Sequence, residues 1–205
     1  IALLVPNIES RRYREIMSGV ETVALKKQHI VMLCNTHASP EEEAEYLKMV
    51  VGRQVDGLIL ASSVMGREQR NALLGPNLPW DTPRGGYLIT QRLLQNDTLP
   101  RAMITASSGQ ASGVLKALQD EKIPVPKRMA LACLSDSSTC AILEPPLTAL
   151  ESPSRRLGMV AARMLFDNIE DNGEEGIGPQ EVILQPKLKI RRSCGNTKPI
   201  YELFG

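Results

Sequence analysis

The residues best placed to do chemistry are small and polar, and they gather where apolar runs end. Ser107 and Ser108 follow the apolar run at 102–104 and stand directly before apolar residues at helical spacing. Serines in this position are typical of three kinds of site: a catalytic nucleophile, a phosphate-binding loop, or the polar wall of a ligand cleft.

The first two kinds of site lack their other parts in this sequence. A catalytic serine needs a sharp G-x-S-x-G turn and a base, but the motif is absent, and His29 and His37 both lie in the first quarter of the chain. Neither glycine-rich phosphate motif, G-x-x-x-x-G-K-[ST] or G-x-G-x-x-G, follows the first apolar run. We therefore predict that the chain is not an enzyme and requires no cofactor.

The cysteines and histidines do not form a metal motif. Cys34, Cys133, Cys140 and Cys194 are widely spread, and no C-x-x-C pair is present. We predict free thiols, mostly buried, in a reducing compartment. No apolar run approaches the ~18 residues needed to span a bilayer, and no signal peptide opens the chain. These features predict a cytoplasmic protein with no membrane partner.

Composition excludes a broad nucleic-acid surface. Only 3% of the 205 residues are aromatic and the net charge is +1, so neither a stacking platform nor a global basic bias is present. Basic residues cluster at 11–14 and at 187–192, where we predict solvated faces.

Strand and helix patterns alternate along the chain. We predict strands at 1–8, 29–36, 55–63, 101–108, 129–137 and 181–193, and helices at 13–24, 39–51, 85–94, 109–118 and 154–169. Ser39 is the expected N-cap of the second helix, with Pro40 at its first position. Such alternation is typical of a doubly wound α/β fold with parallel sheets.

The predicted strands share a feature at their carboxyl ends. These ends read PNIES, CNT, ASS, ASSG and LSDSS. In open α/β sheets ligands bind beyond the carboxyl ends of the strands, where helix N-termini offer N–H donors. The pattern therefore favours binding of a small polar ligand without catalysis.

Several stretches, taken in order, resemble the effector domain of LacI/GalR-type transcriptional repressors. The most specific are PVPKRMALACLSD and PPLTALESPSRRLG, while VDGLIL, DTPRGGYLITQRLL and KLKIRRS extend the resemblance over nearly the whole chain. It implies two doubly wound parallel-sheet lobes of the periplasmic binding protein type, joined by crossover strands and closing on a small effector such as a sugar or purine. It also implies a homodimer that binds operator DNA through an N-terminal helix-turn-helix head, and no residues of that head are matched in this chain.

The resemblance assigns lobes and site residues. The first lobe is expected at 1–95 with 151–172, and the second at 96–150 with 173–205. We predict that the effector is contacted by Asn7, Ser10, Arg12, Tyr13, Ser62, Ser107, Ser108, Ser135 and Asp136.

Some of these residues have a structural alternative. Ser107, Ser108 and Asp136 would cap helices, and Tyr13 would be the first core residue of its helix. Arg11 and Arg12, near a helix N-terminus, would suit an anionic or phosphorylated effector.

Four polar positions depart from the family. Ser107 and Ser108 replace an Asn-Asp pair, Ser135 replaces an Asp, and Thr82 replaces an Asn. Hydroxyls in place of carboxylates and amides remove bidentate acceptors for sugar hydroxyls. This predicts an unusual effector, an effector held mainly by the other lobe, or a lost response.

Two family segments have no counterpart. A strand is missing after Trp80, and a strand with an effector-binding arginine and a helix is missing after Gln95. Losing buried strands would leave unpaired sheet edges. We therefore expect the natural gene product to be longer at these points, and an intact mass near 22.5 kDa would contradict this.

The sequence thus predicts the effector-sensing and dimerisation domain of a LacI-type repressor. The alternative is a periplasmic-type sugar-binding protein of a transport system, which shares the fold. A gene that opens with a helix-turn-helix, in place of a signal peptide, would decide between them.

Overall fold

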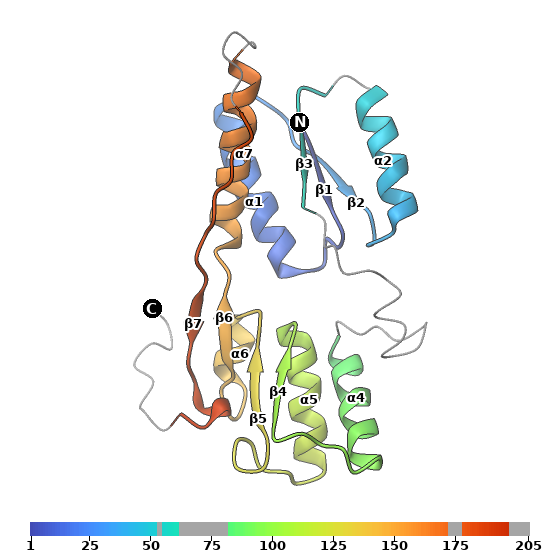
Figure 1. Cartoon of the computed structure of the whole chain (residues 1–205), viewed down its shortest axis with the longest axis vertical. Coiled ribbons are helices and arrows are strands. Elements are labelled where there is room, and N and C mark those ends of the chain that lie inside the picture. The colour runs from blue at the N-terminus through green and yellow to red at the C-terminus, as the bar shows by residue number, and fades with distance from the viewer. Residues whose placement is uncertain (53–54, 62–81, 172–177, 197–205) are drawn as a thin grey trace. The chain divides into compact units, whose positions relative to one another are not determined.

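The computed structural model describes residues 1–52, 55–61, 82–171 and 178–196 (Figure 1). The chain divides into two compact units. Unit 1 comprises Ile1–Met65 with Pro153–Gln185, and unit 2 comprises Gly66–Ser152 with Pro186–Gly205.

Unit 1 is built on a parallel sheet. Its described strands are β2 (Met32–Asn35), β1 (Ala2–Val5) and β3 (Leu58–Leu60), in that spatial order. All four residues of β1 are buried, as expected for a continuous apolar run at the centre of a sheet.

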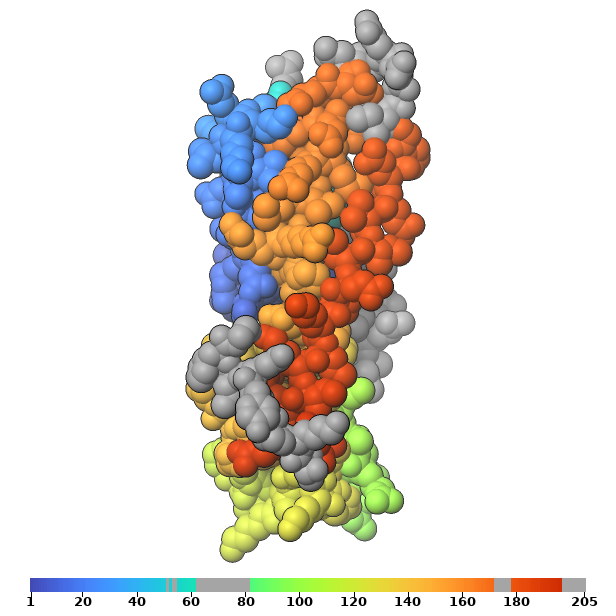
Figure 2. All heavy atoms as spheres, turned by 90° about the vertical axis from the view of Figure 1, so that its left-hand side faces the viewer, coloured from blue at the N-terminus to red at the C-terminus, as the bar shows by residue number. Residues whose placement is uncertain are grey.

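Helices cover both faces of this sheet. α1 (Arg11–Lys26) and α7 (Ser154–Glu170) pack on the face that carries Leu3 and Val5, and α2 (Pro40–Gly52) packs on the face that carries Ala2 and Leu4. Figure 2 shows α1 in blue and α7 in orange lying side by side. The predicted cap of α2 is confirmed, since the N–H of Glu42 donates to Ser39 Oγ at 3.3 Å.

Unit 2 holds a second sheet with the order β4-β5-β6-β7. β4 (Ala102–Thr105), β5 (Ala130–Cys133) and β6 (Thr148–Glu151) are parallel, whereas β7 (Lys187–Lys189) runs antiparallel to β6. α5 (Ser108–Asp120) packs on one face, and α4 (Pro83–Gln95) packs on α5. The short helices α6 (Ser138–Ile142) and η1 (Arg192–Cys194), together with β6, were not predicted. The α/β fold with parallel sheets is confirmed, and β7 is an antiparallel addition to it.

A pair of glycines fixes each helix–helix contact. A Cβ on Gly86 of α4 would lie 2.2 Å from the carbonyl oxygen of Gln110, and one on Gly113 of α5 would lie 1.8 Å from that of Pro83. Gly19 of α1 and Gly158 of α7 are equally confined by backbone of the facing helix. Both helix pairs therefore meet backbone to backbone, where only glycine fits.

The units differ from the predicted lobes in three described segments, 82–95, 151–152 and 178–185. α4 was expected in the first lobe, but it belongs to unit 2 because its glycine contacts join it to α5. The segment at 178–185 was expected in the second lobe, but it belongs to unit 1.

Four of the described strands lie at sheet edges, β2 and β3 in unit 1 and β4 and β7 in unit 2. β3 pairs only with β1, and β4 pairs only with β5. α4 runs directly into β4 through a short connection at 96–101, so no strand intervenes there. The join at Trp80 and Asp81 lies outside the described residues. The expectation of missing strands stays a prediction.

Candidate functional site

A cavity of about 330 Å³ opens in unit 1 beside the N-terminus of α1. It is lined from α1, β3 and α7 by Arg12, Tyr13, Ile16, Ile59, Leu60, Ala61, Leu157 and Ala161. Its size is at the lower end of small-molecule sites, and its lining is mostly apolar with one charged group. Two of the predicted effector-binding residues, Arg12 and Tyr13, are thus brought to one cavity.

The three arginines at the start of α1 differ in their partners. Arg11 Nε forms an ion pair with Glu15 Oε1 at 2.7 Å, and Arg14 donates to the carbonyl oxygen of Glu9. Arg12 makes no hydrogen bond or ion pair within the part of the chain that the structure describes, and it is exposed. Its guanidinium therefore keeps its donors for a ligand.

The loop before α1 leaves the positive end of the helix without a side-chain anion. Ser10 is the N-cap, yet its hydroxyl makes no capping hydrogen bond, and the first turn contains no acidic residue. Asn7 Oδ1 accepts from the N–H of Glu9 at 2.8 Å, so it orders the loop. The helix dipole and Arg12 both favour a negative group here.

Ser107 and Ser108 form the N-terminus of α5. Ser107 Oγ is the N-cap and accepts from the N–H of Gln110 at 3.2 Å, while Gln110 Oε1 accepts from the N–H of Ala106 at 3.0 Å. This exchange resembles a capping box displaced by one residue. Ser108 is the first residue of the helix. The capping alternative is confirmed for Ser107, and ligand contact by either serine stays a prediction.

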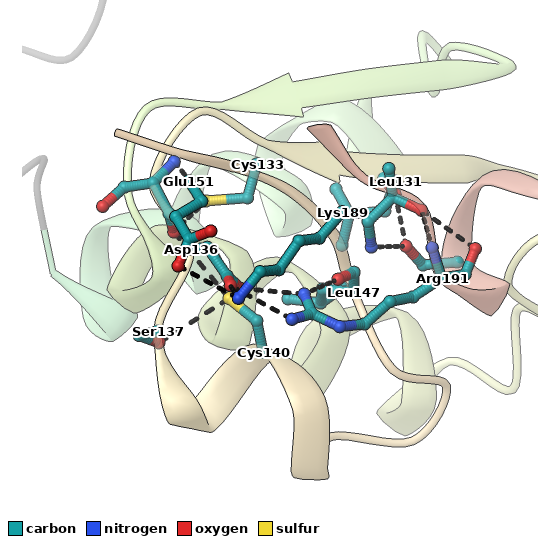
Figure 3. A network of polar contacts seen from close by, with 12 residues as sticks. Leu131, Cys133, Asp136, Ser137, Cys140, Leu147, Glu151, Lys189 and Arg191 are labelled. Atoms are coloured by element: carbon teal, nitrogen blue, oxygen red, sulfur yellow. Dashed lines mark hydrogen bonds and ion pairs between the residues drawn. The ribbon is translucent and has the colours of Figure 1, made fainter. Parts of the chain in front are cut away.

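Asp136 is buried in an ion-pair network at the end of β5 (Figure 3). Its Oδ1 and Oδ2 accept from Nη1 and Nη2 of Arg191 at 2.8 and 3.1 Å, and Lys189 Nζ lies 3.4 Å from Oδ2. The two main partners are only 8% and 4% exposed. Burial alone would raise the pKa of Asp136, but the hydrogen bonds and charges of Arg191 and Lys189 outweigh it and lower that pKa.

Arg191 also ties the last segment of the chain to the sheet. Its Nη1 donates to the carbonyl oxygen of Leu147 at 2.6 Å, and its backbone N–H donates to Thr148 Oγ1 at 2.8 Å. Ser193 Oγ donates a hydrogen bond of 2.6 Å to the carbonyl oxygen of Leu131.

The predicted solvated face at 187–192 is wrong for Arg191, because its charge is buried against Asp136. In a strand, alternate residues share a face, so Lys187, Lys189 and Arg191 lie on one side. This spacing was the feature of the sequence that could have indicated a common acidic partner.

The structure describes Ser135 and the four cysteines but not Ser62. Ser135 has its backbone N–H 3.3 Å from Cys133 Sγ and is half-buried, and Ser62 lies outside the described residues. Cys34, Cys133 and Cys140 are buried, whereas Cys194 is exposed. Effector contact by Ser135 and Asp136 stays a prediction.

The described residues contain neither a metal-binding cluster nor a membrane-spanning helix. In those ranges no three His, Cys, Asp or Glu side chains are grouped so that they could hold a metal ion. No helix within the same ranges has the length and apolar character to cross a bilayer.

Residues 23–194 match the family of periplasmic binding protein-like domains. The HTH-type transcriptional repressor PurR of Actinobacillus pleuropneumoniae serotype 5b (strain L20) is 22% identical over 273 residues, covering 96% of this chain and 81% of the repressor. PurR of Yersinia pestis (strain Pestoides F) is 26% identical over 279 residues, covering 96% and 80%. Both alignments are longer than the 205-residue chain, so the relatives contain segments that have no counterpart here.

Solved structures share the fold. The transcription regulator GntR from Chromobacterium violaceum superimposes with a TM-score of 0.79 at 19% identity, covering 95% of this chain and 99% of that one. A LacI family regulator from Enterococcus faecium, with bound ribose, gives a TM-score of 0.72 at 20% identity, covering 94% and 97%. One from Lactobacillus casei, with bound sucrose, gives 0.72 at 18% identity, covering 94% and 98%. The chain belongs to the periplasmic binding protein-like domain family and, within it, to the effector-binding domains of LacI/GalR-type regulators.

Proposed function

We propose that this chain is the effector-sensing domain of a LacI-type transcriptional repressor and that its effector is a small polar molecule with an anionic group, such as a sugar phosphate or sugar acid. The observation that carries the proposal is the cavity in which Arg12 and Tyr13 meet. The domain would act in the cytoplasm as part of a homodimer, without catalysis.

The cavity has parts that suit such a ligand. Tyr13, Ile16 and Leu157 offer an apolar surface against the carbon skeleton of a sugar. Arg12 offers a planar set of donors to a phosphate or carboxylate, and the uncapped N-terminus of α1 adds a favourable dipole. Ribose and sucrose in two of the structural neighbours support a sugar skeleton.

Regulation would proceed by a shift of population. An effector stabilises whichever conformation binds it more tightly, and the DNA-binding head then responds to that conformation. A typical coupling of ~1–3 kcal/mol changes operator affinity roughly 5- to 150-fold. The relatives named as HTH-type repressors support this role over that of a transport protein.

A thermal unfolding panel tests the proposal. The purified chain is heated with neutral sugars, sugar phosphates, sugar acids and purines in separate samples. A ligand at about 100 times its dissociation constant stabilises the folded state by ~2.7 kcal/mol, which gives a clear rise in melting temperature. We expect phosphorylated or acidic sugars to produce the rise, and no rise with any compound would overturn the proposal.

A pair of variants tests the role of Arg12. Arg12→Ala is expected to abolish the rise given by anionic sugars, because its guanidinium lines the cavity. Arg11→Ala is the matched control, because Arg11 is paired with Glu15 on the helix surface and does not line the cavity. Equal loss in both variants would show that only general positive charge matters.

A further inference from the structure

Two thiols meet in the core of unit 2. Cys133 ends β5 and Cys140 lies in α6, and both side chains are buried in the same hydrophobic core cluster. Both sulfurs also lie near one atom, the carbonyl oxygen of Ser135, at 3.2 Å for Cys133 and 3.8 Å for Cys140 (Figure 3). Neither thiol is part of the proposed ligand cavity.

The surroundings distinguish the two sulfurs. The neighbouring Cys133 side chain lowers the pKa of Cys140, as do the hydroxyl and backbone of Ser137, while burial and the charge of Asp136 oppose this. The Cys140 side chain and burial raise the pKa of Cys133. These directions favour Cys140 as the thiolate and Cys133 as its protonated neighbour.

Exposed residues lie beside the two buried thiols. Leu134, Ser138 and Thr139 are exposed, and Ile142 at the end of α6 is 77% exposed. Cys133 and Cys140 themselves are 2% and 0% exposed, so a reagent reaches them when this loop and the five-residue α6 open locally.

We propose that Cys133 and Cys140 are an oxidation site that forms an intramolecular disulfide across the loop carrying Ser135 and Asp136.

The oxidant is a peroxide. The Cys140 thiolate attacks one peroxide oxygen, the O–O bond breaks, and the departing hydroxide takes up the thiol proton as water, leaving Cys140 sulfenic acid. The sulfur of Cys133 then attacks the sulfenic sulfur, the S–O bond breaks, and the hydroxide that leaves takes the Cys133 proton as a second water. Two thiols are oxidised by two electrons, and one peroxide is reduced to two waters.

The disulfide would affect the ion pair beside it. A disulfide holds its sulfurs about 2.0 Å apart, closer than any hydrogen-bonded thiols, so the loop must tighten when it forms. Asp136 is in this loop and anchors Arg191 and Lys189, so oxidation acts on the attachment of β7 and η1. Disulfides in reducing compartments are mostly transient and serve as sensors, which matches a reversible site.

Peptide mapping of the full chain tests the proposal. The chain is treated with hydrogen peroxide at neutral pH, the remaining thiols are alkylated after denaturation, and the protein is digested without reductant. Both cysteines lie in one tryptic fragment, residues 129–155, and cleavage before Asp136 separates them. We expect this fragment to lose two hydrogen atoms and escape alkylation, and its two halves to stay joined until dithiothreitol is added.

The other cysteines supply controls. Cys34 is buried and Cys194 is exposed, and both should remain mostly alkylated under conditions that convert the pair. Cys194→Ser should keep the disulfide, and Cys140→Ser should lose it. Alkylation of both Cys133 and Cys140 after peroxide treatment, oxidation to sulfinic acid without a linked fragment, or linkage to Cys34 or Cys194 would overturn the proposal.

Discussion

At the residue scale, Asp136 and Arg191 form a buried ion pair, and the loss of either charge would destabilise the fold. Both side chains are buried, and two hydrogen bonds join the guanidinium to the carboxylate. Removing one charge leaves the other buried without compensation. The pair joins the end of β5 to the segment after β7, so it fastens the antiparallel strand of unit 2.

Asp136→Asn is expected to lower the free energy of unfolding by ~3–5 kcal/mol, as for other broken buried ion pairs. Glu144→Gln is the matched control, because the Arg192–Glu144 pair is 55% and 75% exposed and contributes at most ~1 kcal/mol. Urea unfolding at pH 7 measures both. If Asp136→Asn lowered the free energy of unfolding by no more than Glu144→Gln does, Asp136 would have no structural role.

The same pair predicts a dependence on pH. The pKa of Asp136 is lowered in the folded state, so its stabilising contribution is complete above the unfolded value of about 3.9 and is lost as the pH falls through the lower folded value. We expect the difference between Asp136→Asn and the unmodified chain to be constant from about pH 5 to 7 and to shrink below about pH 4. A difference that persists unchanged at pH 2 would contradict the ion pair as its source.

Residue types near strand ends were a partial guide to the site. Arg12 and Tyr13 were predicted as effector contacts from the family resemblance, and both line the cavity. Leu157 and Ala161 of the same cavity were not, because only the folded chain brings α7 to α1. Asp136 was predicted as an effector contact or a helix cap, whereas its ion-pair partner Arg191 is remote in sequence and was predicted to lie on a solvated basic face.

At the element scale, glycine contacts fix which helices pair. Gly86 and Gly113 set the spacing of α4 and α5, and no side chain larger than hydrogen fits at either position. This contact explains why α4 belongs to unit 2.

Gly113→Ala is expected to destabilise the fold by ~1–3 kcal/mol, because its methyl group would collide with the backbone of Pro83. Gly86→Ala should act in the same direction. Gly52→Ala is the matched control, since a Cβ there meets nothing within 4 Å, and helical alanine should be neutral or stabilising by up to ~1 kcal/mol. Thermal unfolding compares them, and a stable Gly113→Ala would contradict the close helix contact.

Long, strongly patterned elements were predicted and short ones were not. The apolar spacing of α1, α5 and α7 and the continuous run of β1 are visible in the sequence. β6 has four residues between prolines and α6 has five, so neither contains enough periods to be recognised. The antiparallel direction of β7 depends on pairing with β6, which local sequence does not specify.

At the scale of the whole molecule, unit 2 exposes apolar surface on its sheet. Strand register puts Ile104, Leu150 and Leu188 on the face opposite α5, and Ile104 and Leu188 are 68% and 60% exposed. β4 beside them is an edge strand among the described strands. Exposed apolar edges of this kind promote association between chains.

Ile104→Lys is therefore expected to reduce concentration-dependent self-association of the chain, as light scattering measures. Ile142→Lys is the control, because Ile142 is 77% exposed on α6 and lies off this sheet face. If Ile142→Lys reduced scattering as much as Ile104→Lys, added charge alone would explain the effect.

The central claim is that an anionic sugar binds at the start of α1. Hydrogen exchange of the chain, alone and with the panel compound that raises the melting temperature most, tests it directly. The account predicts slower exchange in peptides that cover residues 7–16 and 58–61, where the cavity is built. Unchanged exchange in both peptides, with protection confined to other parts of the chain, would contradict it.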